Sequence, residues 1–216
     1  MKSKTAQIIY KSGLIPLFYH HDADSSISVI NACYKGGVRV VEYVNRGDAA
    51  LLNFPVIKDH IQNYCPGMIL GAGSVLNRQQ AEKFIQLGAD FIVSPILSKE
   101  IALSCIDHDT YWIPGCATPT EIARARALGA DIIKVFPGNV LGPGFIKSVL
   151  GPMPGLKLMP TGGVEPTKDN LRAWFDAGAV GVGMGSKLID QEMTGKPDLL
   201  TAKVKEVIDI IISIRN

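Results

Sequence analysis

Leu128-Gly129-Ala130-Asp131 joins the end of an amphipathic helical stretch to the apolar run Ile132-Ile133-Lys134-Val135-Phe136. Glycine suits the position just past a helix because it adopts positive φ without a steric penalty, and the short turn then leads straight into a strand. The same junction recurs three times, as Lys35-Gly36-Gly37-Val38, Leu87-Gly88-Ala89-Asp90 and Ala177-Gly178-Ala179-Val180. The chain therefore repeats a helix-turn-strand unit.

The spacing of these junctions predicts the fold. Intervals of roughly forty to fifty residues leave room for a further unit in most gaps, which gives about eight units of some 25 residues. The predicted strands are short and largely apolar on both faces, as parallel strands covered by helices are. They are Leu14–Phe18, Val38–Val44, Met68–Gly71, Phe91–Val93, Tyr111–Ile113, Ile132–Phe136, Leu156–Met159 and Val180–Gly183. We expect an α/β protein, a single (β/α)₈ barrel domain over residues 1–216 with an N-terminal helix; a doubly wound open sheet is the alternative.

Helix starts support this division of the chain. Asn77 is placed to cap a helix over Arg78–Leu87, and Thr118 with Glu121 has the form of a capping box. The tail, Asp198–Arg215, predicts a final helix whose run Ile208-Asp209-Ile210-Ile211-Ile212 holds more apolar residues than one buried stripe needs. Ordinary core packing and an oligomer contact both explain that excess.

Composition excludes several classes of protein. The 22 Lys and Arg are scattered among 20 Asp and Glu, without the basic stripe that a nucleic-acid partner requires. No signal peptide and no run of eighteen apolar residues is found, so we expect a cytoplasmic protein without a membrane partner. The four cysteines contain no Cys-x-x-Cys pair, which fits neither a zinc site nor a disulfide framework.

Lys134 is the first candidate for chemistry, because it is the sole polar residue of its predicted strand. If the side chain points into a barrel, desolvation favours the neutral amine. A neutral amine attacks carbonyl carbon, as Schiff-base catalysis requires. The alternative is a lysine that extends to the strand end and keeps its charge in water.

Glu42 is the second candidate and lies near the end of Val38–Val44. A buried carboxyl group can exchange protons at neutral pH. The alternative is a buried ion pair with Arg39, Arg46 or Lys134. Active sites of barrels lie at the carboxyl ends of the strands. Lys134 and Glu42 are therefore stronger candidates for catalytic residues than charged residues on helices.

Two glycine-rich segments follow the last two predicted strands. They are Pro160-Thr161-Gly162-Gly163-Val164 and Gly181-Val182-Gly183-Met184-Gly185-Ser186. In many barrels these loops hold a phosphate through backbone N–H groups, and a serine hydroxyl adds a donor. Glycines that serve tight turns alone are the other explanation.

Six blocks of the chain resemble the KDPG/KHG aldolase family, which comprises 2-dehydro-3-deoxyphosphogluconate and 4-hydroxy-2-oxoglutarate aldolases. The likeness extends from about Gly13 to Leu188. The blocks are Gly36-Gly37-Val38-Arg39-Val40-Val41-Glu42, Gly71-Ala72-Gly73-Ser74-Val75-Leu76, Ser94-Pro95, Pro114-Gly115-Cys116-Ala117-Thr118, Lys134-Val135-Phe136-Pro137 and Pro160-Thr161-Gly162-Gly163-Val164.

The resemblance implies a metal-independent class I lyase without a cofactor, which cleaves a keto-acid phosphate and assembles as a homotrimer. Matching the motifs, Lys134 corresponds to the Schiff-base lysine and Glu42 to the general acid/base. The implied substrate-binding residues are Arg46 and Ser74 for the carboxylate, Pro95 and Thr161 as lining, and Gly162, Gly163 and Ser186 for the phosphate.

The chain also departs from the family pattern. Val44-Asn45 stands where many members have Thr-Leu, and Lys187 stands where some have tryptophan. Tyr19-His20-His21-Asp22 lacks an arginine that some relatives place there. These differences bear on the choice of substrate.

Three other functions compete with the lyase. A phosphosugar isomerase or epimerase, or a non-catalytic phosphosugar-binding barrel, would share the phosphate loops. A metal-dependent aldolase would use His20, His21, Asp22 or Asp24, but adjacent histidines are expected to point to opposite sides of a strand.

Overall fold

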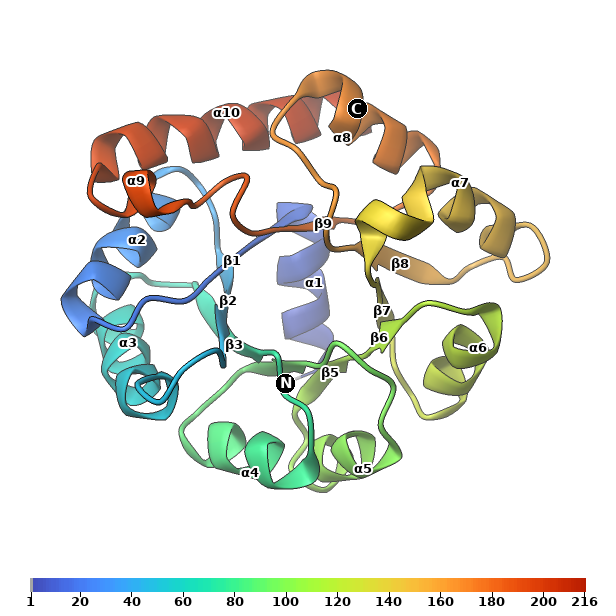
Figure 1. The fold of residues 1–216 in the computed structure, drawn as a ribbon, viewed down its shortest axis with the longest axis horizontal. Helices are drawn as coiled ribbons and strands as arrows, with labels where there is room; N and C mark the ends of the chain where they lie inside the picture. The colour runs from blue at the N-terminus through green and yellow to red at the C-terminus, as the bar shows by residue number, and fades with distance from the viewer. Residues whose placement is uncertain (1) are drawn as a thin grey trace.

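The computed structural model describes residues 2–216 and contains two parallel sheets. The larger has the strand order β5-β4-β3-β2-β1-β9, and the smaller has the order β6-β7-β8. Figure 1 shows the strands around a common centre with the helices outside them and α1 in the middle. The strands are β1 (Leu14–Phe18), β2 (Val40–Val44), β3 (Ile69–Gly73), β4 (Phe91–Val93), β5 (Tyr111–Ile113), β6 (Gly115–Cys116), β7 (Ile132–Val135), β8 (Lys157–Pro160) and β9 (Val182–Met184).

Helices separate nearly all of these strands along the chain. They are α1 (Lys2–Ser12), α2 (Ala23–Lys35), α3 (Ala50–Tyr64), α4 (Arg78–Gln86), α5 (Lys99–Asp107), α6 (Pro119–Ala127), α7 (Gly138–Leu150), α8 (Lys168–Asp176), α9 (Gln191–Thr194) and α10 (Pro197–Arg215). The eight predicted strands are confirmed within about two residues at their ends, and so is the final helix. None of the helices described in residues 2–216 combines the length and the apolarity needed to cross a bilayer.

Pro114 separates β5 from β6, a break that the sequence analysis missed. Proline has no N–H to donate to a neighbouring strand, so the ladder is interrupted there. The two sheets also meet on their other side, where the Val180 N–H donates to the Leu158 carbonyl at 3.0 Å and Thr161 bridges to Gly183. The strand ends of both sheets are thereby brought together.

The repeated helix-strand junction is confirmed in detail. Gly37, Gly88, Gly129 and Gly178 have φ angles of 104°, 89°, 88° and 101°. Any residue with a Cβ would be strained in this conformation, which explains why glycine occupies each junction.

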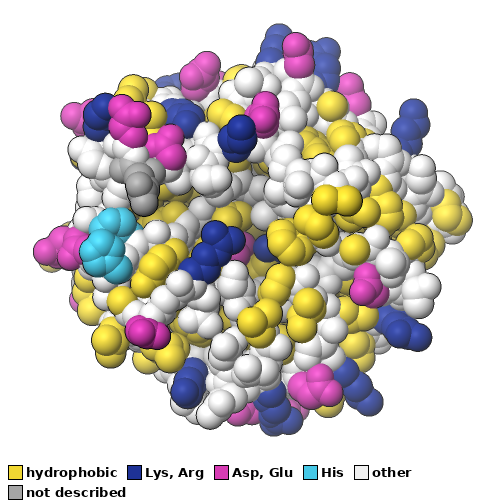
Figure 2. All heavy atoms as spheres, in the orientation of Figure 1, with side chains coloured by type: hydrophobic (Ala, Val, Ile, Leu, Met, Phe, Trp, Pro, Cys, Tyr) yellow, Lys and Arg dark blue, Asp and Glu magenta, His cyan; other side chains and the backbone are white. Residues whose placement is uncertain are grey.

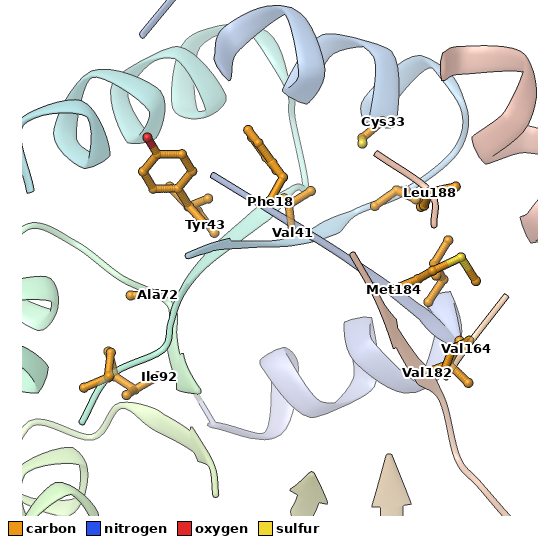
Figure 3. Close-up of a cluster of buried hydrophobic side chains, with 14 of the residues drawn as sticks. Phe18, Cys33, Val41, Tyr43, Ala72, Ile92, Val164, Val182, Met184 and Leu188 are labelled. Atoms are coloured by element: carbon orange, nitrogen blue, oxygen red, sulfur yellow. The ribbon is translucent and has the colours of Figure 1, made fainter. Parts of the chain in front are cut away.

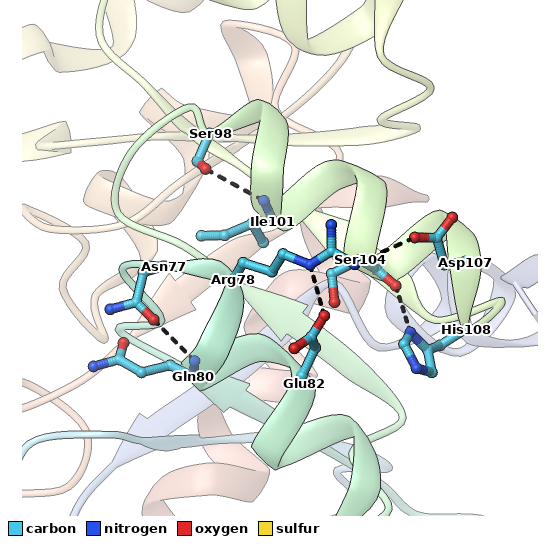
Figure 4. A network of polar contacts seen from close by, with 9 residues as sticks. All are labelled: Asn77, Arg78, Gln80, Glu82, Ser98, Ile101, Ser104, Asp107 and His108. Atoms are coloured by element: carbon cyan, nitrogen blue, oxygen red, sulfur yellow. Dashed lines mark hydrogen bonds and ion pairs between the residues drawn. The ribbon is translucent and has the colours of Figure 1, made fainter.

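The predicted helix starts are also confirmed. The Asn77 side chain accepts a hydrogen bond from the Gln80 N–H, and Thr118 with Glu121 forms the complete capping box. Figure 4 shows the Asn77 cap beside the ion pair of Arg78 with Glu82, and the cap of α5 by Ser98.

Two apolar clusters divide the core. An inner cluster within the ring of strands contains Ala6, Ile9, Ile15, Val40, Phe91, Val93, Tyr111, Ile113, Ile132 and Met159. A larger outer cluster lies between strands and helices. Figure 3 shows part of it, with Phe18 and Tyr43 pointing from their strands toward the helices at a ring separation of 5.5 Å. Successive residues of β1, β2, β4, β5, β7 and β8 thus enter different clusters, as the two-residue period of a strand requires.

The final helix packs mainly through one stripe. Leu200, Val204, Val207 and Ile211 are buried, and α10 lies against α2 and α8. Ile208 and Ile210 are partly buried against the core, and Ile212 stays half exposed.

A polar cluster connects elements at the amino ends of the strands. Asp131 accepts hydrogen bonds from Tyr10 at 2.9 Å, Tyr111 at 3.0 Å and Lys157 at 2.8 Å. Partial burial acts to raise the pKa of the Asp131 carboxyl, but the bonds from Lys157, Tyr10 and Tyr111 outweigh it and hold that pKa below its ordinary value. The cluster ties α1 to the strands that it covers.

Asp131→Asn should weaken the fold in a pH-dependent way. A lowered folded-state pKa contributes stability above the unfolded pKa of about 3.9, and this contribution is lost as the pH falls through the folded value. We expect the free energy of unfolding to drop by about 1 kcal/mol at pH 7, allowing for solvent screening, and by progressively less below about pH 4.

Urea unfolding of both proteins at several pH values measures this difference. Asp209→Asn is the matched control, because the Lys205–Asp209 pair is exposed on α10 and should contribute only about 0.3 kcal/mol. An equal loss of unfolding free energy in both variants, or a loss independent of pH, would contradict the stabilising role given to the Asp131 carboxylate.

Candidate functional site

Lys134 is buried on the inner face of β7. Its neighbour Ile132 belongs to the inner cluster, whereas Ile133 and Val135 belong to the outer one, so the alternation places Lys134 inside. The residue is only 5% exposed, and its Nζ lies 5.2 Å from the centre of the Phe136 ring. The amine therefore lies against an aromatic face, and the alternative of a lysine extended into water is wrong.

Glu42 occupies the equivalent position on β2. Val40 packs in the inner cluster, Val41 and Tyr43 pack in the outer one, and Glu42 is 2% exposed. Its carboxylate lies over Gly73 of β3, where a Cβ would overlap it. Glycine at that position is therefore required by the place that the carboxylate takes.

Two buried oxygen atoms at the carboxyl ends of the strands have no protein partner. Within residues 2–216, Glu42 Oε2 and Thr161 Oγ1 form no hydrogen bond, and Glu42 forms no ion pair with Arg39, Arg46 or Lys134. Unpaired buried polar atoms are costly and rare, so each such atom needs an explanation. A polar ligand between β2 and β8 would satisfy both.

A pocket of about 1150 Å³ opens at this end of the molecule. Its walls come from the ends of β1, β2, β7, β8 and β9 and from α9. Figure 2 shows this face, with a basic side chain near its centre and histidines gathered at one edge. Five of the predicted site residues line the pocket: Arg46, Thr161, Gly162, Gly163 and Ser186. Phe136, whose ring lies against the Lys134 amine, lines it too.

The pocket contrasts with a smaller cavity of about 200 Å³ at the amino ends of the strands. That cavity is lined mostly by apolar residues next to Tyr111 and Asp131. Its one carboxylate is already bonded within the Asp131 cluster. The larger pocket is therefore the candidate site.

The backbone brings the remaining predicted residues to the same rim. The Asn45 N–H donates to the Gly73 carbonyl at 2.8 Å, which joins the segment carrying Arg46 to the end of β3 just before Ser74. Ser74 has a φ of 56°, an uncommon value for a residue with a side chain and one that clusters at functional sites. Arg46 itself is exposed.

Pro95 is positioned against the strand next to Lys134. A Cβ on Gly115 would overlap the Pro95 backbone, and Gly115 pairs in register with Lys134. Pro95 is half-buried and does not line the pocket of about 1150 Å³. Pro95 therefore lies beside the strands that carry Gly115 and Lys134 and not in the pocket wall.

The two glycine-rich loops lie side by side. The bridge between Thr161 and Gly183 joins them, and Gly162 and Gly163 have φ values of 89° and 69°. Ser186 is exposed two residues after β9. This arrangement brings glycine backbone and a hydroxyl group to one part of the pocket wall, as anion-binding loops do.

Part of the pocket wall was not predicted from the sequence. Tyr19, His20 and His21 line the pocket, as do Asp190, Glu192 and Thr194 at α9. The expectation that His20 and His21 point to opposite sides was wrong: their rings stack at 4.5 Å with 28° between the planes. Both follow the end of β1, so the alternation of a strand does not apply. Polar residues directly after a strand were the available signal.

A metal site at these histidines finds no support. Over residues 2–216 there is no group of three or more His, Cys, Asp or Glu side chains arranged to hold a metal ion. Asp22 instead caps α2 by accepting a hydrogen bond from the Ser25 N–H.

Comparison with known proteins identifies clear relatives. A family model described as KDPG and KHG aldolase matches residues 5–207. A 2-dehydro-3-deoxy-6-phosphogalactonate aldolase of Escherichia coli (strain K12) is 31% identical over 179 residues, which are 82% of this chain and 85% of the relative. A 2-dehydro-3-deoxy-phosphogluconate aldolase of Haemophilus influenzae is 30% identical over 98% of this chain and 100% of the relative.

A solved structure is similar in fold. The KDPG aldolase from Legionella pneumophila, with pyruvate captured at low pH as a covalent carbinolamine intermediate, matches with a TM-score of 0.84 and 25% identity. The match covers 93% of this chain and 96% of the other.

Proposed function

Because this chain belongs to the KDPG and KHG aldolase family, we propose that Lys134 is the nucleophile with which it forms a Schiff base. The chain is a class I aldolase, a lyase that acts on a keto acid. The observation that carries the assignment is a 5% exposed lysine at the carboxyl end of a strand, beside the pocket. The uncharged amine is the form of a lysine that attacks a ketone.

Glu42 is the general acid/base of this proposal. Its carboxylate is buried, and its Oε2 has no partner within residues 2–216. A carboxyl group without a protein partner is free to exchange protons with a substrate or with a water molecule. Its place on the inner face of β2 directs it toward the same interior as Lys134.

The substrate is 2-dehydro-3-deoxy-6-phosphogluconate, with 4-hydroxy-2-oxoglutarate as a second substrate. Arg46 and Ser74 hold the carboxylate next to the ketone, an orienting role. Thr161 lines the pocket, and Pro95 contributes from its place beside Gly115 and Lys134. Gly162, Gly163 and Ser186 take the phosphate, as the positions of their loops after β8 and β9 favour.

The reaction begins when Lys134 Nζ attacks C2 of the keto acid. Glu42 transfers protons through the carbinolamine, which loses water to give an iminium ion. This cation accepts the electron pair of the C3–C4 bond once Glu42, acting through a water, removes the C4 hydroxyl proton. The aldehyde, glyceraldehyde 3-phosphate or glyoxylate, leaves. The enamine is reprotonated at C3, and hydrolysis releases pyruvate and restores the amine. The iminium is the electron sink, so no metal or cofactor enters the sequence.

We infer that the protein is one closed (β/α)₈ barrel over residues 1–216. β5 and β6 count as one strand interrupted at Pro114, and the Val180 to Leu158 bond with the Thr161–Gly183 bridge supports closure between β8 and β9. We also expect a cytoplasmic homotrimer. Sedimentation equilibrium should then give three times the 23.2 kDa of one chain.

Borohydride reduction in the presence of pyruvate tests the proposed function. The expected product is a chain carrying one reduced pyruvyl adduct, which peptide mass spectrometry places on Lys134. An unmodified chain that interconverts phosphosugars would identify an isomerase or epimerase. An unmodified chain that binds a phosphosugar without turnover would identify a binding protein.

Gly73→Ala should slow the reaction without removing any reacting group. The new Cβ overlaps the Glu42 carboxylate and must displace it. Because a displacement of about 1 Å can cost about 10²-fold, we expect kcat to fall by about that factor. Gly144→Ala is the matched control, since a Cβ there meets open space. Thermal unfolding should show both variants folded; near-normal kcat in Gly73→Ala would mean that the position of the carboxylate is unimportant.

A further inference from the structure

The loop after β1 lies between the two halves of the site. β1 pairs with β2 on one side and with β9 on the other, with Leu17 opposite Glu42 and Pro16 opposite Met184. The segment after β2 carries Arg46, and the segment after β9 carries Ser186. A substrate that reaches from the first segment to the second must therefore pass the end of β1, where His20 and His21 line the pocket.

Buried side chains hold this loop in place. The Tyr43 hydroxyl donates to the His20 carbonyl at 2.7 Å, and Asn53 Nδ2 donates to the His21 carbonyl at 2.9 Å. Tyr43 and Asn53 are 0% and 9% exposed. The Ser26 hydroxyl adds a bond to the Asp22 carbonyl at 2.9 Å. A loop fixed by partners from β2, α2 and α3 presents its side chains with little entropy left to lose on binding.

The backbone of Asp22 engages one nitrogen of the His20 ring. His20 Nδ1 lies 3.1 Å from the Asp22 nitrogen and 3.3 Å from the Asp22 carbonyl oxygen, so Nε2 is the nitrogen left for a ligand. The His21 ring stacks on it at 4.5 Å. His20 is half-buried and His21 is exposed.

The acidic groups around the same pocket are already engaged. Asp22 caps α2, and Asp190 caps α9 by accepting from the Met193 N–H at 2.8 Å. Glu192 is paired with Lys196, and Glu165 with Lys187 at 3.3 Å. The imidazoles line the pocket, and an imidazole N–H can donate to an anion or a hydroxyl group held there.

We propose that His20 and His21 form a subsite for the phosphate-bearing aldehyde half of the substrate and favour phosphorylated keto acids. The inference rests on the proposed function, because it takes the ketone to lie at Lys134 and the carboxylate at Arg46. The pyruvyl half lies on the other side of β1 and does not reach the imidazoles. Tyr43 and Asn53 act as positioning residues for the loop.

The test compares His20→Ala/His21→Ala with the unaltered enzyme in three measurements. The kcat/KM for 2-dehydro-3-deoxy-6-phosphogluconate should fall about tenfold for each lost donor. The rate of borohydride trapping with pyruvate, which lacks the aldehyde half, should stay unchanged. Calorimetric binding of glycerol 3-phosphate, which carries the phosphate and no carbonyl, should weaken by a similar factor.

Two further variants keep the outcome interpretable. His108→Ala is the matched control, because His108 is exposed at the end of α5 and bonds to the Ser104 carbonyl. His20→Gln retains a donor on a side chain of similar reach and should recover part of the lost kcat/KM. The His108→Ala and His20→Gln proteins should both bind glycerol 3-phosphate more tightly than the variant that lacks both imidazoles.

The results separate failure of the subsite from failure of the proposed function. Unchanged kcat/KM and unchanged glycerol 3-phosphate binding in the double variant would overturn the subsite. An equal loss in pyruvate trapping would also overturn it, by showing that the loop serves only the fold. Absence of any pyruvate adduct in the unaltered enzyme would instead overturn the proposed Schiff base. The glycerol 3-phosphate measurement would still show whether the histidines bind a phosphate.

Discussion

Lys134→Met should abolish aldol cleavage, with kcat reduced by at least about 10⁴-fold. Methionine fills a similar volume against the Phe136 ring but has no nitrogen to attack the ketone. Loss of a nucleophile removes the covalent path altogether, and the residual rate comes from binding and polar groups alone. Pyruvate release in a coupled assay measures the effect, and mass spectrometry after borohydride should find no adduct.

Lys147→Met provides the matched comparison, since Lys147 is an exposed lysine in the last turn of α7. That variant should retain full activity and full trapping. Circular dichroism should show both proteins folded. A Lys134→Met enzyme that keeps a tenth of the normal kcat would refute covalent catalysis at this residue.

Glu42→Gln should lower kcat by about 10² to 10⁴-fold and at the same time preserve or raise thermal stability. The amide has nearly the shape of the carboxyl group but cannot exchange the protons that the carbinolamine and the C4 hydroxyl require. A buried carboxylate whose Oε2 lacks a partner within residues 2–216 is costly to the fold, so its neutral replacement should relieve that cost. Kinetics and thermal unfolding on one preparation measure both effects.

Glu206→Gln, on the exposed face of α10, is the control for loss of a carboxylate. Glu206→Gln should change neither kcat nor thermal stability. If Glu42→Gln lost activity only in proportion to a loss of folded protein, Glu42 would be a structural residue and not a proton carrier.

The positions of helices and strands were predictable because local patterns encode them. The glycines of the αβ turns and the caps at Asn77 and Thr118 act within a few residues of chain, so sequence alone reveals them. The break at Pro114 was missed because β6 is a two-residue strand, too short to show a period. The kink in α7, where Gly142 leaves helical geometry with a φ of 71°, was also missed, although Gly142-Pro143-Gly144 holds the residue types that break helices.

The candidate site was predictable where a residue contradicted its surroundings. A lysine and a glutamate within apolar strands stand out, and the structure buries both. The contribution of α9 was not predictable, because Asp190, Glu192 and Thr194 sit in an ordinary polar segment. The stacking of His20 on His21 depends on a loop held by Tyr43 and Asn53, residues 23 and 32 positions away from the carbonyls that they bind.

The Asp131 cluster lies at the opposite end of the strands from the pocket. Its three partners come from α1, β5 and β8, and none of its members lines the candidate site. Changes there act on the stability of the fold through groups that are not part of the pocket wall. An engineer who wants a more robust catalyst can therefore begin at the amino ends of the strands, away from the pocket.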